Sequence, residues 1–251
     1  MLALDLPSTS PPATAAGAAA QASSQGLRSL ARAAQHDILR RLAPPLRHDM
    51  VVHLQSLGMM AEALGARMER GAAATEDLQG GVSKLNRLAR NAVTRCLDVC
   101  SWMQPAEDDS AALADVAAEI VRLLSTSLNF RGFELRLEAG TGDGDLHVSR
   151  SAARFLLAGA ILSLVDSVRT PGEITVSMEV SSSHGVVALQ WQPQAEGSFT
   201  QQHDAGEAPL QWPELQALAL QHGVELLRND DSIVLCLPRA LVTTPLTMAP
   251  V

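Results

Sequence analysis

The chain has 251 residues, of which 47% are hydrophobic and 3% aromatic, and it contains no tyrosine. This length allows one or two domains with a substantial core, and the low aromatic content favours Ala- and Leu-rich helices over a β-sandwich. The formal net charge of −8 makes nucleic acid and anionic membrane surfaces unfavourable partners. We expect no membrane span and no signal peptide, and the 3 cysteines fit reduced thiols of a cytoplasmic protein.

The N-terminal third predicts a leader followed by a long helix. Residues 1–26 are rich in Ala, Ser, Pro and Thr, which predicts a disordered leader. Helical periodicity begins near Leu27, is kinked or restarted at Pro44–Pro45, and continues to about Met68. Beyond the prolines, apolar positions repeat at spacings of four and three, as in a helix packed lengthwise against other helices. The residues of this seam, one of them a histidine, are Leu46, Met50, His53, Leu57, Met60 and Leu64.

A second seam of the same spacing follows a turn at Arg70–Gly71 and ends at Pro105. Gly80–Gly81 weaken its first turn, so we expect the stable helix to begin at Val82. Both helices carry further apolar residues beside their seams, which a single hairpin cannot bury. Pairing two hairpins into a four-helix bundle would bury them, so the pattern predicts a homodimer. The second seam is Leu78, Val82, Leu85, Ala89, Ala92, Cys96, Val99 and Met103, and the further residues are Val51, Leu54, Ala61 and Leu88.

The pattern changes after residue 105 to alternating helices and strands. Helices are expected at about 110–128, 151–168 and 212–221, strands at 133–137, 173–180, 185–192, 224–227 and 232–237, and loops at 140–145 and 194–211. This order predicts an α/β sandwich with helices on one face of a mixed sheet. The fold class is therefore α+β, with a helical hairpin at 27–105, an α/β sandwich at 106–240 and a flexible tail at 241–251.

Over about residues 27–240, this arrangement resembles the core of two-component histidine kinases: a dimerising phosphoacceptor bundle followed by an ATP-binding domain of the GHKL (Bergerat) type. His48-Asp49 matches the His-Asp phosphoacceptor box of that family. The strand Gly172–Val176 reads Gly-Glu-Ile-Thr-Val and follows an apolar helix, as it does in the family.

The nucleotide-binding motifs of the family are missing from this chain. The two asparagine positions of the family's nucleotide-binding helix fall on Gly159 and Ser163. No Asp-x-Gly-x-Gly loop follows Trp191, and no glycine-rich lid follows later. Phosphate sites need backbone N–H groups that glycines make accessible. The second domain is therefore expected to keep the fold and to have lost ATP binding.

A kinase-like core without kinase motifs resembles the bundle-type histidine phosphotransferases, which relay phosphoryl groups between the aspartates of receiver domains. The resemblance implies that His48 carries the phosphoryl group and that Asp49 orients its ring or takes its proton. It also implies receiver domains of response regulators as partners, with a hybrid histidine kinase as a further one. No cofactor and no metal are expected in this chain, because the receiver would supply the Mg²⁺.

Several alternatives stay open. His36-Asp37 is a second His-Asp pair and competes with His48. His53 is either a buried seam residue or, with Asp49, part of an Asp-x-x-x-His motif that resembles the phosphatase motif of one kinase subfamily. The whole protein could instead be a sensor-type kinase, or a non-catalytic pseudokinase that sequesters a receiver.

Overall fold

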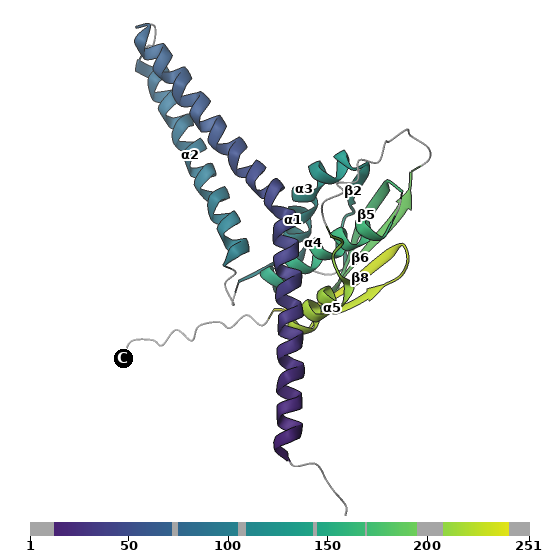
Figure 1. Ribbon diagram of the computed structural model, residues 1–251. Coiled ribbons are helices and arrows are strands. Elements are labelled where there is room, and N and C mark those ends of the chain that lie inside the picture. The colour runs from purple at the N-terminus through teal and green to yellow at the C-terminus, as the bar shows by residue number, and fades with distance from the viewer. Residues whose placement is uncertain are drawn as a thin grey trace, which may run out of the picture.

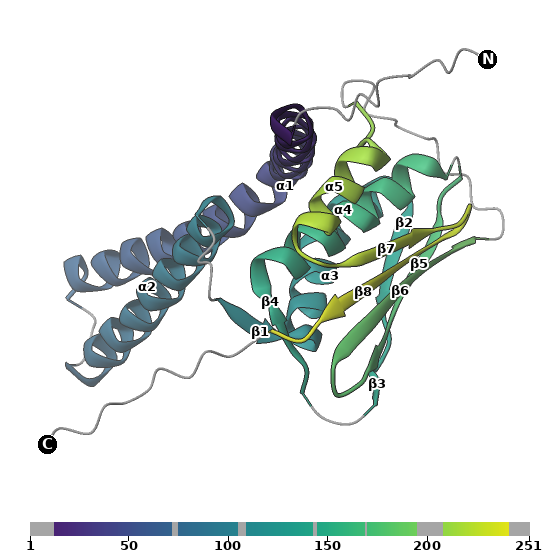
Figure 2. The same cartoon turned by 90° about the horizontal axis from the view of Figure 1, so that it is seen from below.

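The computed structural model describes residues 13–71, 75–104, 109–142, 145–168, 170–194 and 208–240. Two long helices precede an α/β domain whose helices lie on one face of its sheet (Figures 1 and 2). This arrangement confirms the fold class that the sequence predicts. The helices are α1 (Ala13–Glu69), α2 (Thr75–Met103), α3 (Leu113–Phe130), α4 (Arg150–Ser167) and α5 (Trp212–Gln221).

The sheet of the α/β domain is mixed, as predicted. Its strands, in spatial order, are β2 (Phe133–Leu137), β5 (Gly172–Val180), β6 (His184–Pro193), β8 (Ser232–Pro238) and β7 (Glu225–Arg228). β2 runs parallel to β5, and the other neighbours along this path are antiparallel.

Three short strands differ from the sequence prediction. β3 (Thr141–Gly142) lies beside β5 in a segment predicted as a loop. β1 (Ser110–Ala112) pairs with β4 (His147–Ser149), so the helix expected from residue 110 begins only at Leu113. The ladder with β4 uses the backbone groups that a first helical turn would otherwise need.

The core of the α/β domain lies between the sheet and its helices. Alternate residues of the central strands face the helices, as the two-residue period of a strand requires. Among them, Ile174, Val176, Leu189, Ile233 and Leu235 are 0% exposed. α4 is buried along almost all of its residues because it lies between the sheet and α1.

α1 is a single helix that runs past both of its prolines. It begins at Ala13, inside the predicted leader, because the alanines of residues 13–22 have the highest helix propensity. It bends about halfway along its length, and Pro44 and Pro45 lie in that region (Figure 1). A proline inside a helix removes a hydrogen bond and crowds the preceding turn, so the predicted kink is present.

The two halves of α1 pack against different partners. In the first half, Ala31, Ala34, Ile38 and Leu42 are 0% exposed and belong to the core that α4 and α5 share. Their spacing places them on one face of the helix. The second half pairs with α2, and this hairpin stands clear of the α/β domain (Figures 1 and 2). The pairing with α2 therefore begins near the prolines, and residues 31–42 of α1 pack on the α/β domain.

The hairpin is closed by a tight turn and a close approach of its helices. Gly71 ends α1 with a φ of 62°, the left-handed conformation that glycine adopts without strain. α2 already begins at Thr75, so the predicted start at Val82 is wrong. A Cβ at Gly81 would lie 2.5 Å from Leu64 Cδ1, so the glycine lets the two helices approach each other. Packing against α1 thus outweighs the low helix propensity of the glycines.

The seams are only partly buried in a single chain. Leu64 and Ala92 are buried, Leu57 and Leu85 are half-buried, and Val82 is 54% exposed.

Cys96, Cys100 and Cys236 are free thiols. None of the helices described is both long and apolar enough to cross a membrane.

The docking of the first half of α1 can be tested at Ile38. We expect Ile38→Ala to lower the free energy of unfolding by about 3 kcal/mol, because it leaves a cavity in a closed core. Arg40→Ala, at an exposed position of the same helix, should change it by less than about 0.5 kcal/mol. Urea denaturation followed by circular dichroism measures both variants. Equal stability of the two would contradict the docking.

Candidate functional site

His48 lies at the point where α1 leaves the α/β domain. Leu46 is the last residue of α1 in the core of that domain, and His48, two residues later, is exposed. Within the described part of the chain, no hydrogen bond or ion pair engages its ring. A partner protein can therefore reach the imidazole.

Asp49 is directed towards the α/β domain. Its Oδ1 lies 3.4 Å from the NH1 nitrogen of Arg122, which projects from α3. Successive residues of a helix are turned by about 100° from each other, so the carboxylate that faces α3 points away from the neighbouring ring. Arg122 thus brings a positive charge next to the His-Asp pair from another part of the sequence.

His53 lies on the seam of the hairpin and is half-buried. Asp49, one turn before it, pairs with Arg122, and among the described residues no hydrogen bond joins Asp49 and His53. This position fits a packed seam residue. The suggested phosphatase motif stays a prediction.

His36 and Asp37 lie on the half of α1 that docks on the α/β domain. The Nδ1 atom of His36 is 3.5 Å from Asp37 Oδ1, and the His36 side chain is 78% exposed. The two residues are thus in contact, whereas His48 and Asp49 are not. Twelve residues separate His36 from His48, about 18 Å along a helix, so the two sites cannot act together.

A buried ion pair ties α1 to the end of α4. The guanidinium of Arg41 donates two hydrogen bonds to Asp166, from NH1 at 2.5 Å and from NH2 at 2.8 Å. The side chains are 4% and 12% exposed. Asp166 also accepts a hydrogen bond from the backbone N–H of Leu210 at 3.0 Å, and Arg131 lies 3.9 Å away. This bidentate pair holds the first half of α1 in one orientation.

A second polar cluster ties the end of α2 to the start of α4. Arg154, 3% exposed, pairs with Glu119 at 2.6 Å and donates a hydrogen bond to Ser101 Oγ at 2.8 Å. Its guanidinium lies over the ring of Trp102, which packs edge-on against Phe155. Both helices of the hairpin are therefore anchored to α4, one near each of its ends.

The two positions that correspond to the family's asparagines are closed by packing. A Cβ at Gly159 would lie 2.7 Å from Leu215 Cδ1 and 2.8 Å from Ile38 Cδ1. Ser163, one turn further along α4, is 2% exposed. The first half of α1 thus fills the space next to Gly159, where a longer side chain would have to fit.

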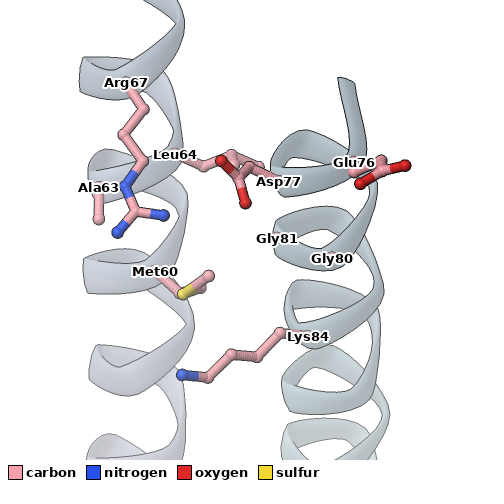
Figure 3. A pocket seen from close by; sticks show the side chains of 9 residues that line it. All are labelled: Met60, Ala63, Leu64, Arg67, Glu76, Asp77, Gly80, Gly81 and Lys84. Atoms are coloured by element: carbon pink, nitrogen blue, oxygen red, sulfur yellow. The ribbon is translucent and has the colours of Figure 1, made fainter. Parts of the chain in front are cut away.

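A pocket of about 350 Å³ opens between α1 and α2 near the turn of the hairpin (Figure 3). Met60 and Leu64 point from α1 towards α2, and Lys84 reaches back towards α1 (Figure 3). Gly80 and Gly81 line the pocket with their backbone alone. Met60 lies twelve residues beyond His48, about 18 Å along the helix, so this pocket is separate from the His48 site.

The ionisable groups with clear pKa shifts lie elsewhere. Burial lowers the pKa of His222, at the end of α5, so its ring is neutral at pH 7. Burial and then the nearby carboxylate of Glu225 raise the pKa of the Cys236 thiol. Within the described ranges, no three His, Cys, Asp or Glu side chains gather closely enough to hold a metal ion.

Sequence reasoning singled out His48 and Asp49 but neither Arg122, which pairs with Asp49, nor the buried Arg41–Asp166 pair. Asp166 carried a signal, because it is the only acidic residue of an otherwise apolar helix and so required a buried partner. Arg122 carried none, since it lies on the polar side of an ordinary amphipathic helix.

Solved structures, but no protein families, are similar to this chain. No protein-family model matches it, and neither does any curated protein. Among solved structures, a histidine kinase from Burkholderia phymatum STM815 is similar, with 16% identity, a TM-score of 0.41, and coverage of 82% of this chain and 97% of that one. The catalytic domain of histidine kinase ThkA shares 13% identity at a TM-score of 0.40 (53% and 97% covered). The mycobacterial sensor histidine kinase MprB shares 14% at 0.34 (53% and 99% covered).

Proposed function

We propose that this protein is a histidine phosphotransferase that relays phosphoryl groups between receiver-domain aspartates through His48. The observation that carries the proposal is an exposed histidine, next to an Asp–Arg pair, on a helical hairpin that stands clear of the α/β domain. A receiver domain can approach this face of the hairpin without displacing any part of the chain that the structure describes.

The chemistry needs little from this chain. A neutral imidazole nitrogen is nucleophilic at pH 7 and attacks the phosphorus of a receiver's phospho-aspartate. The bond between phosphorus and the aspartyl oxygen breaks as the bond to the ring nitrogen forms, and the other ring nitrogen loses its proton to water. The receiver supplies the Mg²⁺ and the lysine that balance the phosphoryl charge.

The packing around Gly159 supports a relay over an ATP-dependent kinase. Ile38 and Leu215 occupy the space where the first asparagine side chain of the resembled family would lie. The buried Arg41–Asp166 pair holds α1 in this place. The first half of α1 therefore covers Gly159 as long as it stays in the core.

We therefore expect no binding of Mg-ATP at millimolar concentration. Isothermal titration calorimetry should give only the heat of dilution, and a thermal melt should not shift, since a ligand that binds the folded state raises its stability. A dissociation constant in the micromolar range would favour the sensor-kinase alternative.

His48 is expected to be the only labelled residue. His48→Ala should fold normally, because an exposed helix residue changes stability by less than about 0.5 kcal/mol. It should take up no acid-labile phosphate from a phosphorylated receiver. His36→Ala, which removes the competing histidine, is the matched control and should be labelled like the wild type. Labelling of His48→Ala would move the assignment to His36 or to another residue.

The exposed apolar residues of the hairpin support a homodimer. Apolar side chains that are 41–70% exposed lie along both helices: Val51, Leu54, Met59, Val93, Leu97 and Met103. Exposed apolar surface on this scale is unfavourable in water, and a second hairpin would cover it. The dimer would also fill the half-open seams at Leu57 and Leu85.

Leu57→Glu should break this dimer or unfold the bundle. A charge buried there without a partner costs several kcal/mol, so the association is lost. Gln55→Glu, on an exposed position two residues away, introduces the same charge and should leave the dimer intact. Sedimentation velocity of both variants measures the outcome. A monomeric wild type, or a dimeric Leu57→Glu protein, would contradict the four-helix bundle.

A further inference from the structure

The Asp49–Arg122 pair joins two parts of the chain at the His48 site. Arg122 lies on α3 and Asp49 on α1, 73 residues earlier in the sequence, and 3.4 Å separates Arg122 NH1 from Asp49 Oδ1. Because Asp49 directly follows His48, their Cα atoms are about 3.8 Å apart. Arg122 is therefore held one residue from the phosphoacceptor histidine, on the side of α1 that faces α3.

The Asp49–Arg122 pair contributes little to the stability of the fold. The side chains are 52% and 27% exposed, and ion pairs of such exposure contribute about 0–1 kcal/mol. The buried Arg41–Asp166 pair and the hydrogen bond from Arg154 to Ser101 already hold α1 and α2 on the α/β domain. Arg122 is thus available for a role other than holding the fold together.

The geometry of Arg122 suits a phosphoryl group. A guanidinium has five N–H donors in a rigid fork that fits the oxygens of a phosphoryl group. Only NH1 lies near the Asp49 carboxylate, at a distance that is long for a charged hydrogen bond. Much of the side chain is open to solvent on the exposed side of α3. Its remaining donors can turn to an incoming anion at small cost.

We propose that Arg122 is a further catalytic residue of the phosphotransfer site. During transfer, its guanidinium leaves Asp49 and donates hydrogen bonds to the phosphoryl oxygens as the group moves between the receiver aspartate and the His48 nitrogen. Arg122 stays protonated, and no covalent bond to it forms or breaks. Asp49 holds the guanidinium beside His48 while no phosphoryl group is present. This proposal rests on the phosphotransferase function proposed above.

The test measures the transfer rate from a phosphorylated receiver by rapid quench, at increasing receiver concentration. Arg122→Ala should lower the maximal rate about tenfold or more, because one donor to the developing charge is lost. Arg122→Lys should recover part of that rate, since a lysine keeps the charge but not the fork. Arg136→Ala removes an exposed arginine of β2 that pairs with Glu173 at 3.8 Å, and it should transfer like the wild type.

Asp49→Asn separates a direct role of Arg122 from an indirect one. If Arg122 contacts the phosphoryl group, Asp49→Asn loses the carboxylate that holds the guanidinium but keeps the guanidinium itself, so it should lower the maximal rate by less than Arg122→Ala does. If Asp49→Asn is as slow as Arg122→Ala, Asp49 is the acting group and the proposal is wrong. A defect of Arg122→Ala in the half-saturating receiver concentration alone would show a docking role and would also overturn it.

The same experiment distinguishes this proposal from the function on which it rests. A wild type that takes no label from any phosphorylated receiver would overturn both. A wild type that is labelled on His48, together with an Arg122→Ala protein that is equally fast, would overturn the role of Arg122 alone.

Discussion

The Arg41–Asp166 pair, buried among the apolar side chains around it, sets the geometry of the whole molecule. Two charges that are removed from water must be paired and hydrogen-bonded, and the loss of one partner costs several kcal/mol. Here the Asp166 carboxylate accepts hydrogen bonds from two guanidinium nitrogens of Arg41, NH1 and NH2, and from the backbone N–H of Leu210. Beside the pair, Ile38 and Leu42 are 0% exposed against the α/β domain. α1 is therefore fixed in direction before it reaches its prolines, and the direction of the hairpin follows from the bend there.

This constraint places His48 at a boundary. Up to Leu46, one face of α1 is committed to the core of the α/β domain. Beyond the prolines the same helix pairs with α2, and the ring of His48 is exposed in the first turn after the change. α3 is close enough there for Arg122 to reach Asp49. The site thus combines an accessible helix wall with a charge that a rigid neighbouring domain supplies.

Local periodicity predicted most elements because each of them buries one face of its own. The strand at Phe133–Leu137 and the helix at Trp212–Gln221 have the predicted ends. Local periodicity does not predict which other element each buried face packs against. The spacing of Ala31, Ile38 and Leu42 fits a hairpin seam as well as it fits docking on α4 and α5. Long-range pairs leave no local pattern: Arg41 and Asp166 are 125 residues apart, and Asp49 and Arg122 are 73 apart.

The packing of α1 on the α/β domain suggests a role for this domain that needs no nucleotide. Ile38, which fills the space beside Gly159, lies ten residues before His48, about 15 Å along α1. His48 is thus separated from the space beside Gly159, and it would come closer only if the domain moved along the helix. The Arg41–Asp166 pair and the hydrogen bond from Arg154 to Ser101 oppose such a movement from both ends of α4. A domain clamped in this way is suited to holding a helix wall and an arginine in fixed positions for a protein that arrives with its own phosphoryl group.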